Sequence, residues 1–201
     1  MSIESKVQYY IDKKLINTMY ALTLEELEIC GNLKLEEKNK DGLLKLDDLM
    51  VGDIELDVYK KTRLRCKQKF YTHIFFHTHP QKTARTYPSV EDILKCVKRK
   101  AISIIATRWG LWIIKCESQI KDIDIKVLDD LLKKFYKIEN YMGFSRERNT
   151  SSKSFDEFDL RTRQILLNDI INRIEEIKGT LGINMKLNLW KDTLSLDKFI
   201  I

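Results

Sequence analysis

Two histidines separated by one residue follow an apolar segment. His77 and His79 come directly after FYTHIFF (70–76), a run rich in residues that favour β-strands. Side chains at positions i and i+2 of a strand point to the same side of a sheet, so both imidazoles can face one metal ion. Neutral imidazole is a good zinc ligand. The pair therefore predicts a metal site at the end of a strand.

A carboxylate downstream can complete the ligand set. The sequence Ser89-Val-Glu-Asp92 predicts a helix start, with Ser89 as the N-cap residue and Asp92 in the first turn. Two imidazoles and one carboxylate make three protein ligands and leave a fourth position open, which is typical of catalytic zinc. Glu91 is the neighbouring acid, but it points about 100° away around the helix. Asp92 is therefore the predicted third ligand.

A hydrolytic zinc site also needs a group that accepts and returns a proton. Glu28 is the best placed upstream acid, because it directly precedes an apolar strand; Glu26 is the alternative. The hydroxyl of Ser89 could donate a hydrogen bond to an oxyanion that develops on the substrate. The candidate catalytic residues are therefore Glu28 and Ser89.

Each of these residues also has a purely structural interpretation. The histidine pair can serve packing or hydrogen bonding within a strand. Ser89 can be only a helix cap, Asp92 can favour the helix dipole, and Glu28 can be an exposed acid at a strand edge. His73 lies four residues before His77, about 13 Å along a strand. We expect it to be a core histidine or an outer neighbour of the site.

The elements that must position these residues predict a mixed α/β chain. Apolar residues recur at helical spacing in some segments, and β-branched and aromatic runs mark others. The predicted helices span 5–21, 89–100, 122–140 and 155–178, and Gly179 is the expected stop of the last one. The NKDG turn (39–42) predicts a hairpin, in which a strand that follows the turn pairs with residues 28–36. The other predicted strands span 53–58, 63–67, 70–76, 101–107, 111–117 and 185–190.

Composition limits the class of protein. The chain has 201 residues, of which 43% are hydrophobic, so it can form one domain or one domain with an extension. No apolar run approaches the roughly 18–20 residues of a membrane span. The N-terminus lacks the apolar region of a secretory signal. We therefore expect an intracellular protein of the cytoplasm or nucleus, without contact to a membrane.

The four cysteines suggest a reducing environment. Cys30, Cys66, Cys96 and Cys116 are widely spaced and form no CxxC motif. This spacing excludes a zinc ribbon and a thioredoxin-like motif. We expect buried thiols in a reducing compartment.

Together, three motifs resemble the JAMM (MPN+) metalloprotease family. They are Glu28-Ile-Cys-Gly31, His77-Thr-His79-Pro80 and Ser89-Val-Glu-Asp92, and the resemblance covers about residues 5–117. It implies that His77, His79 and Asp92 bind Zn²⁺, that Glu28 activates water and that Ser89 supports the tetrahedral intermediate. The segment from His79 to Ser89 is slightly longer than is usual for the family.

The resemblance also implies a fold and a reaction. The expected fold is an MPN-type mixed β-sheet flanked by helices, with the layer arrangement of cytidine deaminases. Residues 1–120 would form the catalytic domain, and 121–201 a mainly helical extension that packs on it or completes it. The implied activity is that of a zinc-dependent isopeptidase, which hydrolyses conjugates of ubiquitin or a ubiquitin-like protein.

Two other functions stay open. One is a zinc hydrolase of the same fold that acts on other peptides or small amides. The other is a non-enzymatic scaffold or a nucleic-acid-associated subunit, suggested by the net charge of +6. Because acids are interleaved with the basic residues, we do not expect nucleic acid as a partner. The C-terminal helices could bind a protein partner or form a dimer.

Overall fold

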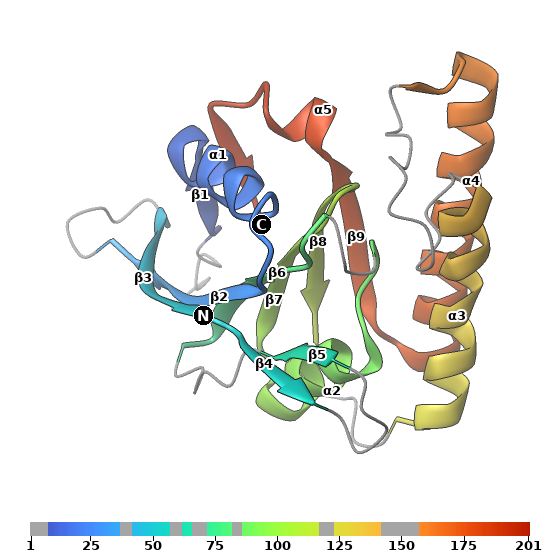
Figure 1. The fold of residues 1–201 in the computed structure, drawn as a ribbon, viewed down its shortest axis with the longest axis horizontal. Coiled ribbons are helices and arrows are strands. Elements are labelled where there is room, and N and C mark those ends of the chain that lie inside the picture. The colour runs from blue at the N-terminus through green and yellow to red at the C-terminus, as the bar shows by residue number, and fades with distance from the viewer. Residues whose placement is uncertain are drawn as a thin grey trace, which may run out of the picture.

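A six-stranded mixed sheet with helices on both faces forms the centre of the molecule (Figure 1). The computed structural model describes residues 8–36, 42–56, 62–65, 72–81, 86–116, 123–141 and 157–201. The strands of the sheet are, in order across it, β3 (Leu44–Val51), β2 (Ile29–Leu35), β6 (Ile74–Thr78), β7 (Ile102–Ala106), β8 (Gly110–Lys115) and β9 (Asn184–Leu189).

Five helices and two small two-stranded sheets complete the described part of the chain. The helices are α1 (Lys13–Leu22), α2 (Val90–Arg99), α3 (Ile125–Tyr141), α4 (Leu160–Leu181) and α5 (Trp190–Thr193). The small sheets pair β1 (Tyr10–Asp12) with β10 (Lys198–Ile200), and β4 (Asp53–Leu56) with β5 (Thr62–Arg65).

The only parallel neighbours in the central sheet are β6 and β7. Helix α2 connects them, as parallel strands require a crossover. On its other side β6 pairs with the antiparallel strand β2. The carboxyl end of β6, where His77 lies, is also where the chain leaves the sheet on its way to α2, the helix that carries Asp92.

Alternating residues of the sheet form two cores. Ile105 and Trp112 point to the face covered by α2, α3 and α4. Ile104 and Leu111, their neighbours in sequence, point to the opposite face, where they pack with α1. This is the period of two that a strand buried on both faces requires. The result is three layers, with the pair α3–α4 along one side in Figure 1.

The C-terminal elements share the sheet and the core of the preceding residues. Strand β9 pairs antiparallel with β8 along its length. Buried apolar residues of α3 and α4 belong to the same cluster as residues of α2 and β8. At the start of α5, the indole N–H of Trp190 donates to the Thr107 carbonyl oxygen over 2.7 Å. Residues 184–189 thus add an outer strand to the sheet that carries the predicted site.

Most of the predicted elements are confirmed where the structure describes them. The mixed α/β class, the β2–β3 hairpin, the strand pair β4–β5, the helix after Ser89 and the return of β9 to the sheet all agree. Parts of the predicted NKDG turn (residues 39–41) and of the polar stretch that follows α3 (142–156) lie outside the described residues.

The predicted first helix is wrong at its start. Residues 5–7 lie outside the described part, and Tyr10–Asp12 form β1 instead of helix. The helix begins at Lys13, where the Asp12 side chain accepts a hydrogen bond from the Leu15 N–H. The end of α4 is also corrected. Gly179 lies within the helix, and the left-handed cap is Gly182 with φ of 68°.

Two further expectations are overturned. His73 is exposed at a bend before β6 and is no core residue. Cys96 and Cys116 form a disulfide with Cα atoms 5.9 Å apart, and Cys30 is also disulfide-bonded. These three are not free thiols, and Cys66 lies outside the described residues. None of the helices that the structure describes is long and apolar enough to cross a membrane.

Candidate metal centre

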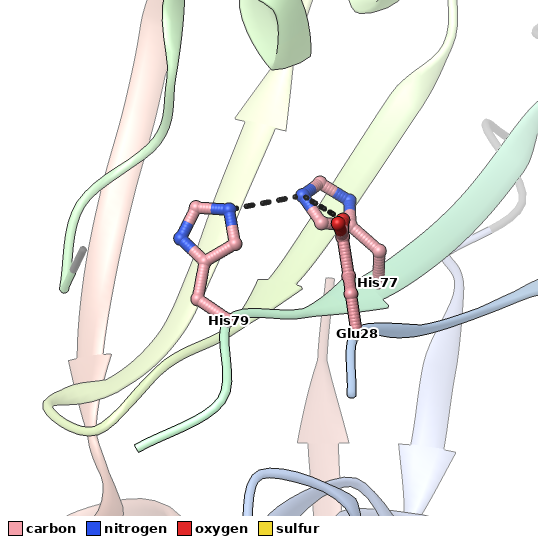
Figure 2. Close-up of side chains that lie close together, drawn as sticks. All are labelled: Glu28, His77 and His79. Carbon is pink, nitrogen blue, oxygen red and sulfur yellow. Dashed lines mark hydrogen bonds and ion pairs between the residues drawn. The ribbon is translucent and has the colours of Figure 1, made fainter. Parts of the chain in front are cut away.

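The two histidines meet at the end of β6. His77 belongs to the strand, and His79 lies just beyond it with its backbone N–H donating to the Ala106 carbonyl oxygen over 2.8 Å. This bond fastens His79 to the end of the parallel strand β7. The Nε2 atoms of His77 and His79 are 3.3 Å apart, and both side chains are buried (Figure 2). The predicted convergence of the two imidazoles is confirmed.

Glu28 reaches the histidines from the neighbouring strand. It directly precedes β2, in which Cys30 pairs with His77. The Glu28 carbonyl oxygen accepts from the Gly52 N–H over 2.6 Å, and the next residue, Ile29, donates its N–H to Thr78 Oγ1 over 2.9 Å. These bonds fix the backbone on both sides of the glutamate. Its Oε1 lies 3.8 Å from His77 Nε2.

Asp92 approaches from the first turn of α2. Its Oδ1 lies 3.1 Å from His77 Nε2, and its Oδ2 lies 3.4 Å from His79 Nε2. Ser89 and Asp92 form a capping box, in which the N–H and the hydroxyl of Ser89 each donate to Asp92 Oδ2 over 2.7 Å. The Asp92 N–H donates to Ser89 Oγ over 3.2 Å. The helix cap therefore also orients the carboxylate toward the histidines.

The two acids of the site have opposite pKa shifts. Burial raises the pKa of the Glu28 carboxyl above its ordinary value of 4.5, against the weaker opposing effect of the nearby histidines. Burial alone would also raise the pKa of Asp92, but His77 and His79 hold it well below its ordinary value of 3.8. The surroundings thus favour the anion at Asp92 and make the carboxylate of Glu28 the more basic of the two.

The pKa of His77 is raised above its ordinary value of 6.5. Burial lowers this pKa, but the Asp92 carboxylate, by charge and by hydrogen bond, and then Glu28 raise it by more. The raised pKa favours a protonated His77 that pairs with Asp92 when no metal is bound. A metal ion would take the place of the proton between them.

The distances fit a small tetrahedral ion. Ligand atoms about 2.0–2.1 Å from zinc are about 3.3 Å from one another at tetrahedral angles. The two histidine nitrogens are 3.3 Å apart, and each lies close to a different oxygen of Asp92, with His77 Nε2 3.1 Å from Oδ1 and His79 Nε2 3.4 Å from Oδ2. Glu28, His77 and His79 also offer ligand atoms that all lie within 4.8 Å of one another. The four side chains can thus hold a metal ion.

The two acids that the sequence left as alternatives, Glu26 and Glu91, lie at the surface and not among the buried side chains of the site. Asp92, in contrast, is buried. Ser89 lies in the site, with its hydroxyl engaged by Asp92.

Two contacts near the site have no local sequence pattern and were not predicted. The Thr78 hydroxyl accepts from the Ile29 N–H, and the buried Glu139 of α3 accepts from Thr86.

No protein family, curated protein or solved structure matches the chain. The function is therefore inferred from the chemistry of these side chains and from the motif resemblance described above.

Proposed function

We propose that the chain is a zinc-dependent isopeptidase of the JAMM (MPN+) type, which hydrolyses conjugates of ubiquitin or a ubiquitin-like protein. The observation that carries the proposal is the meeting of two buried imidazole nitrogens, 3.3 Å apart, with a buried carboxylate whose two oxygens lie 3.1 and 3.4 Å from them, beside the carboxyl of Glu28. His77, His79 and Asp92 would hold the ion. The donor set of two imidazoles and one carboxylate is one that zinc hydrolases use.

Bound zinc would supply a Lewis acid that polarises a carbonyl group and lowers the pKa of water toward about 7. Glu28 would accept the proton of the attacking water at Oε1 and deliver it to the leaving amine as the C–N bond breaks. A partly buried carboxyl with a raised pKa suits this double role, because its raised pKa makes it a stronger proton acceptor than a carboxyl in water while it can still return the proton.

Ser89 would contribute in two ways. Its backbone N–H holds Asp92 Oδ2, which orients a ligand. Its hydroxyl donates to the same oxygen and would have to turn toward the substrate to stabilise an oxyanion. The first role needs only the backbone, so a Ser89→Ala variant separates the two.

The substrate is the part of the proposal that rests on the motif resemblance alone. The MPN-type arrangement of the sheet rests on the same resemblance, whereas the location in the cytoplasm or nucleus stays an expectation from the sequence. Cleavage of other peptides or small amides would use the same donor set, so the experiment has to distinguish the two.

The test measures bound zinc and cleavage of ubiquitin dimers of several linkages. We expect one zinc per chain, cleavage at an isopeptide bond, and a loss of about 10²–10⁴-fold in kcat for Glu28→Gln. Glu26→Gln, two residues away and exposed, is the matched control and should keep full activity. Absence of zinc from the wild type contradicts the proposal. Bound zinc with cleavage of simple amides only would contradict the ubiquitin substrate.

A further inference from the structure

The segment that joins the two ligand-bearing elements is fastened at both of its ends. After His79, Gln81 donates its backbone N–H to the Thr23 carbonyl oxygen and its side-chain Nε2 to Thr23 Oγ1, both over 2.9 Å. Thr23 is the C-cap residue of α1. The other end of the segment, residues 86–89, leads into α2 and carries Ser89. What holds that end decides where α2 begins.

Glu139, a buried residue of α3, holds the segment before α2 at Thr86. Glu139 Oε1 accepts two hydrogen bonds from Thr86, one from the backbone N–H and one from the hydroxyl, both over 2.6 Å. Glu139 is 4% exposed and Thr86 is 1% exposed. A carboxylate buried to this degree is costly unless hydrogen bonds compensate for the lost water. The two buried hydrogen bonds therefore attach Thr86 to α3.

Neighbouring groups complete the attachment. The Thr86 carbonyl oxygen accepts from the indole N–H of Trp112 over 2.8 Å. Tyr87 stacks on Phe135 with ring centroids 5.5 Å apart. Phe135 precedes Glu139 by four residues, so both lie on the same face of α3. Helix α3 and strand β8 together thus fix the backbone immediately before the N-cap of α2.

We propose that Glu139 is a positioning residue of the metal centre, acting through Thr86. Three residues after Thr86 is Ser89, whose cap orients Asp92 toward the histidines. The His77–Asp92 and His79–Asp92 separations depend on where α2 begins. Glu139 would therefore set the position of the third ligand from a helix that touches no metal. The metal part of this inference rests on the proposed function.

The variants remove the attachment in graded steps. Glu139→Ala removes the acceptor, Glu139→Gln keeps a neutral acceptor oxygen, Thr86→Val keeps only the N–H donor, and Thr86→Ser keeps both donors. Ile170→Val is the control, because Ile170 is buried in the same core on α4 but has no part in the attachment. Its lost methylene lowers stability without touching the segment before α2.

The first measurement is the zinc dissociation constant of the folded full-length chain, by competition with a chromophoric chelator. We expect about a tenfold weaker affinity for Glu139→Ala, in the range typical of residues that orient ligands. Glu139→Gln and Thr86→Val should lie between it and the wild type. Thr86→Ser and Ile170→Val should match the wild type. If Glu139→Ala does not fold, Thr86→Val decides.

The second measurement is hydrogen exchange of the metal-free protein. The Asp92 and Ile93 amides bond to Ser89 atoms, so a displaced start of α2 should speed their exchange in Glu139→Ala but not in Ile170→Val. If the wild type binds zinc, and Glu139→Ala shows the same zinc affinity and the same amide exchange rates, the inference is overturned and the proposed function stands. A wild type that binds no zinc overturns the proposed function, and exchange alone then decides whether Glu139 positions α2.

Discussion

At the scale of single residues, the site assigns different tasks to two acids by their surroundings. Asp92 faces both imidazoles and two donors of Ser89, which favours its charged form. Glu28 is partly buried beside His77 at the longer separation of 3.8 Å, where the loss of water outweighs the attraction of the histidines and raises its pKa. The first environment suits a ligand and the second suits a proton carrier.

This division predicts that removing the charge of Asp92 weakens zinc binding, whereas removing that of Glu28 does not. Asp92→Asn should weaken zinc affinity by more than the 10–100-fold typical of residues that only hydrogen-bond to a ligand. The reason is that the variant removes the negative charge of a residue that binds the ion itself. Glu28→Gln should bind zinc close to the wild-type affinity. Chelator competition at neutral pH measures both. Equal loss in the two variants would show instead that Glu28 is a ligand, in the grouping it forms with His77 and His79.

The pKa shifts predict how pH acts on the metal-free protein. The raised pKa of His77 means that its stabilisation is complete below its ordinary value of 6.5 and is lost as pH rises through the folded pKa. The raised pKa of Glu28 acts in the same direction. The lowered pKa of Asp92 acts oppositely, since its stabilisation is lost only as pH falls below its ordinary 3.8 toward the folded pKa.

The melting temperature of the metal-free protein should therefore fall from about pH 6 to about pH 8 through this cluster. The increase in melting temperature on adding zinc should grow over the same range, because zinc must displace the His77 proton. Thermal melts with chelator and with zinc measure both trends, and His77→Ala is the control that should flatten them. A zinc effect that shrinks as pH rises contradicts the assignment of His77 as a ligand.

At the scale of elements, close packing of β2 places Glu28 beside the histidines. A Cβ on Gly31 in β2 would clash with both the Asp48 carbonyl oxygen and the Phe76 ring. Gly179 in α4 has no heavy atom near the position of a Cβ, apart from its own helix and chain neighbours. The two glycines are therefore a matched pair, one required by packing and one not.

Substitution by alanine should lower the free energy of unfolding at Gly31 and raise it at Gly179. Gly31→Ala should destabilise by about 1–3 kcal/mol, because β2 must separate from β3 or from the Phe76 ring. Gly179→Ala should stabilise by about 0.5–1 kcal/mol, because alanine restricts the unfolded chain and favours the helix. Urea unfolding measures both. A stable Gly31→Ala would show that β2 is less tightly packed than described.

Elements and site residues with a local pattern were predictable. The histidine pair follows from the period of a strand, and Ser89 with Asp92 follows from the capping box. Features that depend on distant partners were not. The strand Tyr10–Asp12 exists because of a partner at the other end of the chain, and Ile11 also fits a helical pattern. Glu139 and Thr86 are 53 residues apart, so no spacing links them.

At the scale of the whole molecule, a disulfide ties the ligand helix to the sheet. Cys96 lies four residues after Asp92, one turn along α2, and Cys116 follows β8. Cysteine spacing alone gave no reason to pair them, since only the fold brings them together. The ligand helix is thus held at its start by α3 and near its end by a covalent bond.

Loss of this disulfide should lower the free energy of unfolding by about 3 kcal/mol, the amount typical for a closed loop of this length. The double variant Cys96→Ala/Cys116→Ala isolates the effect, because a reductant would also reduce the disulfide of Cys30. Urea unfolding of the variant and the wild type measures the difference. An unchanged stability would show that this cross-link does not constrain the unfolded chain.

The pairing of β1 with β10 has a consequence for synthesis. Tyr10 lies opposite Ile200, and the Ile201 N–H donates to the Tyr9 carbonyl oxygen over 2.9 Å. Among the described strands, the first to leave the ribosome therefore pairs with the last. During translation, β1 therefore waits without its partner until residues 198–200 have left the ribosome, when all the other described strands have already emerged.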